Sequence, residues 1–308
     1  MINFRYHIVS LVAVFLALAL GVVLGSGPLQ SQIDASWRSP GGTDTATLEK
    51  DLETAEHTVS AQDQAITTLG GKVLAGSLKD LPVALLTAPG ASEKDIETVT
   101  KTLGNAGAKV VGQIGLTEYW EGQGYAPYRD TIASPVSSNL QGGGGTGSSD
   151  EVISRGIVQL MTNPESAKGL LPAILTDEAT PLIEMVTDPK GAAQAVVFVG
   201  AGASAAAAGD GSQSGSVEAD PAGTATTVWA GMAQALSTLK AAVIVGDAQS
   251  EDTPLAKLRA TGSPVATVDG VDTTMAAMTA ALVLADPATG EGDWGTQEGA
   301  EAVLPPLK

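Results

Sequence analysis

The sequence predicts an α/β protein with an N-terminal transmembrane helix, a coiled-coil stalk, and an open, mostly parallel sheet with helices on both faces. An apolar run without charges occupies residues 8–24, and a heptad pattern follows at 48–73. From residue 81 onward, short apolar strand patterns alternate with helical ones, as is typical of parallel sheets. The expected parts are an anchor at 1–28, a hinge and stalk at 29–78, and an extracytoplasmic α/β domain at 79–308.

The apolar run at 8–24 is at the short end of what crosses a membrane. A cleaved signal peptide and a buried core helix are the alternatives. Pro28 directly follows the small residues at 25–27, and a proline after the scissile bond disfavours cleavage. Arg5 precedes the run, and the next basic residue is Arg38. The positive-inside rule therefore predicts a single-pass cell-membrane protein with a cytoplasmic N terminus and its bulk outside the cytoplasm.

The stalk begins after a Ser-Pro-Gly-Gly hinge at 39–42. Apolar positions then recur in alternating steps of four and three, and β-branched residues dominate one of the two seam positions. This pattern favours a parallel two-stranded coiled coil. The seam comprises Leu48, Leu52, Ala55, Val59, Gln62, Ile66, Leu69 and Val73.

The flanks of this seam are acidic, at Glu49, Asp51, Glu56 and Asp63. A pair of identical helices would gain few ion pairs from such flanks, so they also suit a basic partner protein. We therefore expect a homodimer or a heteromer through this helix. A helix packed on its own domain is the remaining alternative, because the repeat is short.

The α/β domain is indicated by a strand at 81–88, a helix opened by Ser92, and a strand at 109–116. A strand, helix and strand in this order predict parallel pairing with a right-handed crossover. Further strands are expected at 195–200, 241–246 and 264–268, and helices near 150–162, 224–239, 252–261 and 272–285.

The composition excludes several kinds of function. Asp and Glu number 34 against 16 Lys and Arg, a net charge of −18, which argues against nucleic acid as a partner. The absence of cysteine excludes disulfides, thiolate metal sites and cysteine nucleophiles. The two histidines, His7 and His57, both precede the α/β domain, so a histidine-based catalytic triad has no candidate there. We expect no enzyme and no resident cofactor.

Three groups of residues are weak candidates for a metal site. Asp247, Glu251 and Asp252 follow a strand, where open α/β sheets bind ligands, and could hold a hard cation; solvated acids at a helix start are the alternative. Met275 and Met278 could bind Cu(I), although an apolar helix face is the commoner use of such a pair. His57 stands alone, at an exposed position of the proposed coiled coil.

Two segments resemble a known family. MINFRYHIVSLVAVFLALALGVVLGSGPL at 1–29, and the segment from Pro264 to Gly295 that ends in a Gly-x-aromatic-Gly turn, resemble the actinobacterial copper transporter family, also called the mycobacterial copper transport protein B family. The resemblance implies a cell-envelope protein with a role in copper homeostasis or export. It supplies no catalytic residues, and copper as a ligand follows from the resemblance only.

A second hypothesis comes from the stalk. The acidic flanks of the seam and the Pro-Gly hinge favour a membrane-anchored scaffold that works by protein–protein interaction. Such a scaffold would recruit or activate an envelope partner, for example a peptidoglycan hydrolase that acts in cell separation.

Overall fold

A computed structural model describes residues 43–142, 147–189, 192–202 and 224–306. The chain forms two compact units, Met1–Gln62 and Asp63–Lys308. The described part of the first unit belongs to helix α3 (Thr43–Val73), whose last turns belong to the second unit. All strands named below belong to the second unit.

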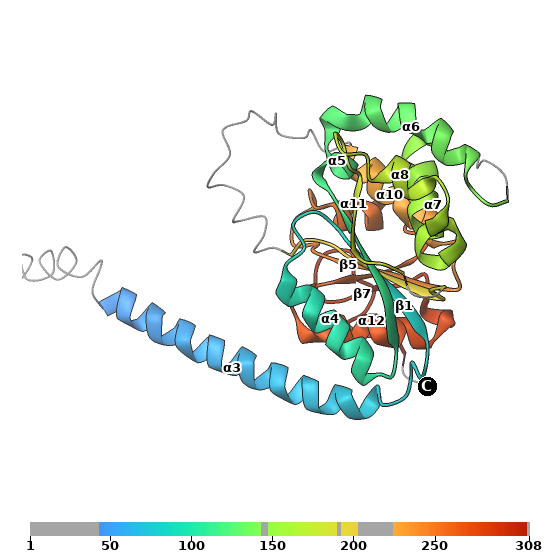
Figure 1. Ribbon diagram of the computed structural model, residues 1–308. Coiled ribbons are helices and arrows are strands. Elements are labelled where there is room, and N and C mark those ends of the chain that lie inside the picture. Colours follow the sequence, from blue (N-terminus) through green and yellow to red (C-terminus); the bar gives the residue numbers. More distant parts are fainter. Residues whose placement is uncertain (1–42, 143–146, 190–191, 203–223, 307–308) are drawn as a thin grey trace, which may run out of the picture. The chain divides into compact units, whose positions relative to one another are not determined.

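The described residues of the second unit contain a seven-stranded sheet in the order β3-β2-β1-β4-β5-β6-β7 (Figure 1). Every neighbouring pair is parallel except β2 and β3, which are antiparallel. The strands are β1 (Pro82–Thr87), β2 (Lys109–Leu116), β3 (Ile183–Thr187), β4 (Ala195–Val199), β5 (Ala241–Gly246), β6 (Ala266–Asp269) and β7 (Asp293–Trp294).

The central strands are apolar along their whole length because both faces of the sheet are covered. All five residues of β4 are buried, and so are the last five of β1 and of β5. Phe198 in β4 packs between two tryptophans, Trp120 and Trp229, with ring centroids 6.0 and 4.7 Å away. These rings fill the core on one face of the sheet.

That face is covered by helices that follow β2, β4 and β5 (Figure 1). They are α5 (Glu118–Glu121), α6 (Ala126–Ser138), α7 (Ser149–Thr162), α8 (Leu171–Leu175), α10 (Thr224–Leu236) and α11 (Pro254–Thr261), with short 3-10 turns at Gln123–Tyr125 and Pro164–Lys168. Side-chain caps fix several starts. Ser148, for example, accepts a hydrogen bond from the backbone of Glu151.

The opposite face is covered by α4 (Glu93–Asn105) and α12 (Thr274–Ala285), with a 3-10 turn at Pro287–Thr289 after them. The end of α3 and the segment after it join the same core: Leu74 and Leu78 are buried, and Ile66 packs against it half-buried. Ser92 caps α4, as the sequence predicts, by accepting a hydrogen bond from Asp95 N at 3.1 Å.

The sheet is mostly parallel, as expected, and is mixed only at its edge, where β3 joins antiparallel to β2. The structure corrects the expected fold in two other respects. Among the helices of the described ranges, none is long and apolar enough to cross a membrane, and the expected transmembrane helix at 8–24 lies outside those ranges. The expected stalk helix packs its C-terminal end, from Ile66, on the α/β core of its own chain. The reason for the last change is that Ile66, Gly70 and Leu74, at steps of four, lie on the side that packs there, whereas Leu69 and Val73 of the seam remain exposed.

Candidate functional site

The topology opens a crevice between the carboxyl ends of β1 and β4. These two strands are neighbours, yet the chain leaves β1 for β2 on one side and continues from β4 to β5 on the other. Helix α4, after β1, packs on one face of the sheet, while α10, after β4, packs on the other. Such a switch point is where open α/β sheets usually bind ligands.

A cavity of about 200 Å³ lies at this crevice. It is formed by strand ends and by the helices that follow β2, β4 and β5. We call it the carboxyl-edge cavity; its lining includes Pro89, Glu121, Gly202, Trp229, Asp247 and Leu255. The cavity therefore combines apolar walls with two carboxylates.

Trp229 forms one wall and orients one of the carboxylates. Its side chain is 4% exposed, and its Nε1 donates a hydrogen bond to Glu121 Oε1 at 3.1 Å. The ring lies so close to the end of β4 that a Cβ on Gly200 would stand 2.6 Å from Cη2. Glycine at this position is thus needed for the tryptophan to reach the strand end.

Asp247 follows β5 and is held by the C-terminal segment. Gln297 Nε2 donates to Asp247 Oδ1 at 3.1 Å, and the Gln297 side-chain oxygen accepts a hydrogen bond from the backbone of Ala248. One amide side chain therefore fixes both the carboxylate and the backbone beside it.

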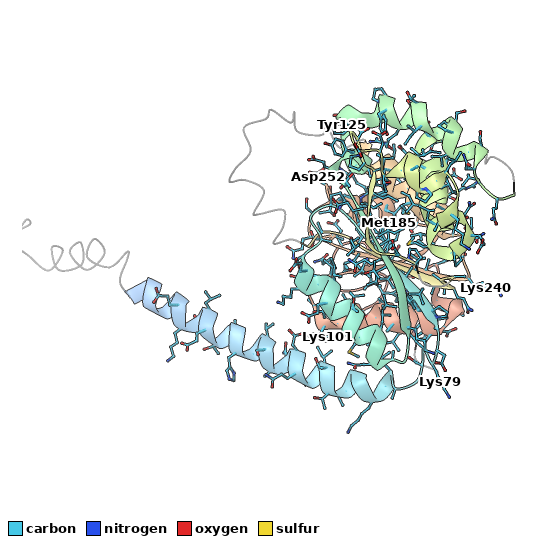
Figure 2. All side chains as sticks on the ribbon, in the orientation of Figure 1. Lys79, Lys101, Tyr125, Met185, Lys240 and Asp252 are labelled. Atoms are coloured by element: carbon cyan, nitrogen blue, oxygen red, sulfur yellow. The ribbon has the colours of Figure 1, made fainter. Side chains whose placement is uncertain are left out.

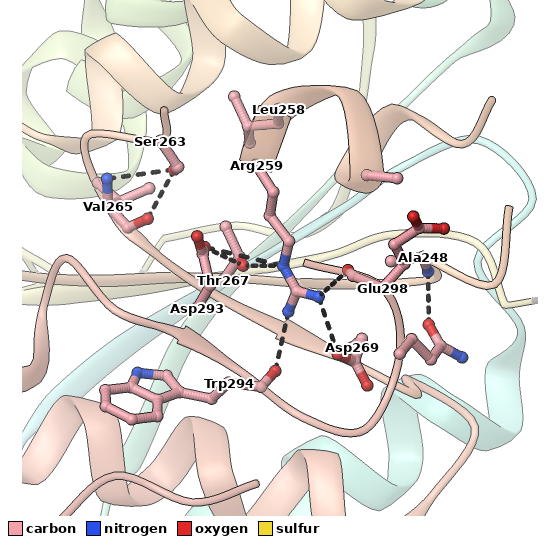
Figure 3. A network of polar contacts seen from close by, with 12 residues as sticks. Ala248, Leu258, Arg259, Ser263, Val265, Thr267, Asp269, Asp293, Trp294 and Glu298 are labelled. Carbon is pink, nitrogen blue, oxygen red and sulfur yellow. Dashed lines mark hydrogen bonds and ion pairs between the residues drawn. The ribbon is translucent and has the colours of Figure 1, made fainter. Parts of the chain in front are cut away.

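The C-terminal segment is itself fixed by Arg259 of α11 (Figure 3). Arg259 Nε donates to Thr267 Oγ1 at 2.7 Å, and one terminal nitrogen donates to Asp269 Oδ2 at 2.9 Å. The same guanidinium donates to the backbone oxygens of Trp294 and Glu298 at 2.9 and 3.0 Å. We call this network the Arg259 clasp. It ties the segment that carries Gln297 to β6 and α11.

The three acidic residues predicted as a possible metal site do not all face the cavity. Asp247 lines the cavity, whereas Glu251 and Asp252 are exposed, and Asp252 pairs with Lys257 at 3.4 Å. In the part of the chain that the structure describes, no three His, Asp or Glu side chains gather into a group able to hold a metal ion.

The other metal candidates lie apart from the cavity lining. Met275 is half-buried and Met278 is buried on α12, where a Cβ on Gly70 would stand 2.3 Å from the Met278 sulfur. His57 is exposed on α3. Met278 thus serves as an apolar packing group against α3.

The predicted coiled-coil seam is largely exposed. Leu52, Val59, Leu69 and Val73 are 59, 57, 62 and 52% exposed, and Ala55 and Gln62 are exposed as well. Ile66 is the exception, because it packs on the α/β core. Among the flanking acids, Glu49 and Asp51 are exposed and Asp63 is half-buried; the side chains of Leu48 and Glu56 lie outside the described part.

Sequence reasoning missed Glu121, Trp229, Gln297 and Arg259. Of these four, only Arg259 could have been suspected from its neighbours in the sequence. It follows Leu258 in a short helix with a buried side, and a buried arginine needs a hydrogen-bonded partner. Asp269, at the end of an apolar strand, could have been predicted as the acidic partner of such an arginine. The other three meet only through the fold.

Comparisons with known proteins identify relatives. Residues 1–305 match the family described as copper transport outer membrane protein, MctB. Proteins named copper transporter MctB from Mycobacterium bovis and Mycobacterium tuberculosis are 34% identical over 140 residues, which cover 44% of this chain and 45% of theirs. The Mycobacterium leprae protein of that name is 32% identical over 129 residues, 38% of each chain. These alignments cover less than half of each relative. Because the family match extends over residues 1–305, the chain belongs to the MctB family of copper transport outer membrane proteins.

Proposed function

We propose that this chain is a non-enzymatic protein of the cell envelope that acts in copper homeostasis or export. The observation that carries the proposal is the family match over residues 1–305, together with the printed name of the curated relatives, copper transporter. The lack of cysteine and the position of both histidines before residue 79 support the non-enzymatic part, since common nucleophile–base sets need one or the other.

A strain that lacks the chain tests the copper role. We expect its cells to hold more copper than the parent during growth in added copper, and re-expression of the chain to restore the parental level. Zinc content, measured in the same cells, is the control. Equal copper contents in the deleted and parental strains would reject the proposal.

A second experiment separates a direct from an indirect role. The full chain is titrated calorimetrically with Cu(I) under anaerobic conditions and with Cu(II), and Zn(II) is the control. Saturable binding tighter than micromolar would make the role direct, and Met275 and Asp247 would then be the first residues to replace. Without binding, the role in copper homeostasis would act through another protein.

We also propose that the described residues lie on the extracytoplasmic side of the envelope. The description of the family as an outer membrane protein family supports this location. A C-terminal fusion to an alkaline phosphatase, which folds actively only outside the cytoplasm, is expected to be active. Activity from a cytoplasmic reporter fused at the same residue would contradict this location.

The exposed seam of α3 favours a second candidate function, a scaffold that recruits or activates an envelope partner such as a peptidoglycan hydrolase in cell separation. Leu52 and Val59 expose large apolar side chains, and Glu49 and Asp51 beside them are exposed acids. Apolar seam positions with acidic flanks suit a second helix that carries basic residues.

Reversal of the four flanking acids to lysine tests the scaffold. We expect the variant with Glu49, Asp51, Glu56 and Asp63 replaced to lose its partner in pull-downs and to leave cells in chains. The matched control reverses four exposed acids of the α/β domain, Asp177, Glu178, Glu184 and Asp188. If both variants behaved like the parent, the scaffold function would be abandoned.

A further inference from the structure

A second cavity lies along one side of α7, near the amino ends of β4 and β5. Its volume is about 410 Å³, within the roughly 300–1,000 Å³ of common ligand pockets. Residues 155, 159 and 162 recur at steps of four and three, so they share one side of α7. The segments that follow α6 and α10 form the other walls. We call this cavity the α7 groove; its lining includes Leu140, Arg155, Val158, Thr162, Thr238 and Leu239.

Gln159 of the lining holds two walls of the α7 groove in place. Its side-chain oxygen accepts a hydrogen bond from Gln141 N at 2.7 Å. Its Nε2 donates to Asn139 O at 3.2 Å and to Ser166 Oγ at 3.0 Å. One amide thus joins α7 to the segment after α6 and to the 3-10 turn at Pro164–Lys168. These bonds preorganise the groove, which lowers the cost of binding a ligand there.

Arg155 is the only charged side chain among the described residues that line the groove. Its Nη2 lies 2.5 Å from Glu151 Oε1, one turn earlier on α7. Its Nε is buried and has no hydrogen-bond partner within the described ranges. A guanidinium has five N–H donors, so the pair with Glu151 leaves donors for a ligand. Because a buried donor without a partner costs free energy, an acceptor that meets this guanidinium removes that cost.

Two threonine hydroxyls of the lining are available as acceptors. Thr162 Oγ1 donates to Val158 O at 2.9 Å. Thr238 Oγ1 donates to Ala235 O at 2.7 Å. Each hydroxyl has one proton, which these bonds use, so it offers a ligand its oxygen lone pairs. The ligand that complements this lining therefore carries hydroxyl donors as well as a negative acceptor for the arginine.

The charge of the groove selects an anion. Lys240 directly follows Leu239 of the lining and lies exposed at the rim of the domain (Figure 2). A cationic ligand would meet Arg155 with like charge, and a neutral one would offer it no counter-ion. A polyanion such as nucleic acid is disfavoured by the net charge of −18. A small ligand with a single negative charge fits both conditions.

We propose that the α7 groove binds a small hydroxy acid, a molecule with one carboxylate and several hydroxyls, such as a sugar acid. Its carboxylate accepts hydrogen bonds from Arg155. Its hydroxyls donate to Thr162 and Thr238, and its carbon chain lies against Val158 and Leu239. This site is independent of the role in copper homeostasis, and its test contains no copper.

The test uses the full chain with ¹⁵N-labelled arginine, whose five Nε–H signals report the five Arg residues. The Arg155→Lys variant assigns the Arg155 signal. Glucuronate is titrated against glucose, which has hydroxyls but no carboxylate, and against hexanoate, which has a carboxylate but no hydroxyls. We expect a saturable shift of the Arg155 signal with glucuronate, binding of hexanoate that is weaker by about tenfold or more, and no shift with glucose.

Three variants, titrated calorimetrically with glucuronate, locate the binding. Arg155→Gln is expected to weaken it about tenfold or more, and Thr238→Val, which keeps the side-chain shape, about threefold. The four remaining arginine signals show whether Arg155→Gln keeps its fold. The matched control, Lys168→Gln, removes an exposed cation outside the lining and is expected to change affinity less than twofold.

Four results would overturn the proposal. They are a shift without saturation, equal binding of glucuronate and glucose or of glucuronate and hexanoate, equal affinities of the parent and Arg155→Gln, and a loss in Lys168→Gln as large as that in Arg155→Gln.

Discussion

Arg259 and Asp269 meet at 2.9 Å with side chains that are only 2% and 1% exposed. The arginine comes from α11 and the aspartate from the end of β6, so the pair joins a helix to the sheet. Asp269 Oδ1 also accepts a hydrogen bond from the backbone of Thr296 at 2.8 Å. The pair therefore holds the C-terminal segment that carries Gln297, and through it Asp247 at the carboxyl-edge cavity.

Replacing Arg259→Ala should destabilise the second unit strongly. The change leaves the buried Asp269 charge without a counter-ion, which typically costs about 3–5 kcal/mol. Urea unfolding measures the loss. The control is Lys101→Ala, which breaks an exposed pair with Glu97 and should cost less than about 1 kcal/mol. Losses of similar size in the two variants would show that the Arg259 clasp contributes no more than a surface ion pair.

Gly295→Ala tests how closely the C-terminal turn approaches Asp269. A Cβ at residue 295 would stand 2.2 Å from the Asp269 carboxylate, and the backbone φ there is +136°. The substitution therefore combines a clash with strain, and we expect a loss above about 2 kcal/mol.

The control for that substitution is Gly142→Ala, at φ +93°, where no atom of the described residues lies within 4 Å of the new Cβ. It isolates the backbone strain, for which we expect roughly 1 kcal/mol. Urea unfolding of both variants separates the two contributions. Equal losses would mean that the carboxylate of Asp269 moves away without cost.

The buried strands could be predicted because their sequences are continuous apolar runs bounded by turn residues. β1, β4 and β5 fall within the stretches expected from the sequence. β3 carried no such signal, since only Ile183 is buried in it and Glu184, Val186 and Thr187 are exposed at the edge. Its antiparallel direction depends on the helices between β2 and β3, which local patterns do not determine.

The sequence predicts where the cavity lies, but not which residues line it. Asp247 could be placed at a strand end because the sequence shows where β5 stops. Its neighbours come from distant parts of the chain: Glu121 from α5, Trp229 from α10 and Gln297 from the C-terminal segment. A single sequence does not indicate these contacts, because each depends on the order of the strands in the sheet and not on the spacing of the residues along the chain.

The contact between α3 and α12 can be tested with two adjacent glycines. A Cβ on Gly70 would stand 2.3 Å from the sulfur of buried Met278, while one on Gly71 would meet nothing within 4 Å. Gly71→Ala should stabilise the helix by up to about 1 kcal/mol. Gly70→Ala gains the same helix propensity, but the clash with Met278 should lower its free energy of unfolding by about 1–3 kcal/mol. Urea midpoints compare the two, and equal midpoints would show that Met278 changes rotamer freely.

The last prediction separates the two roles of the apolar residues at 48–78. Leu74 is buried in the α/β core, so Leu74→Ala should cost about 2–5 kcal/mol at any protein concentration. Leu52 is 59% exposed, so Leu52→Ala should change the stability of an isolated chain by less than about 0.5 kcal/mol. If the exposed seam pairs with a second copy, however, the parent's unfolding midpoint rises with protein concentration, and Leu52→Ala reduces that dependence. Unfolding measured over a hundredfold range of concentration decides between the two cases. A midpoint that does not depend on concentration in either protein would show that the seam does not pair with a second copy, because self-association responds to mass action. The exposed seam would then be expected to bind a different partner.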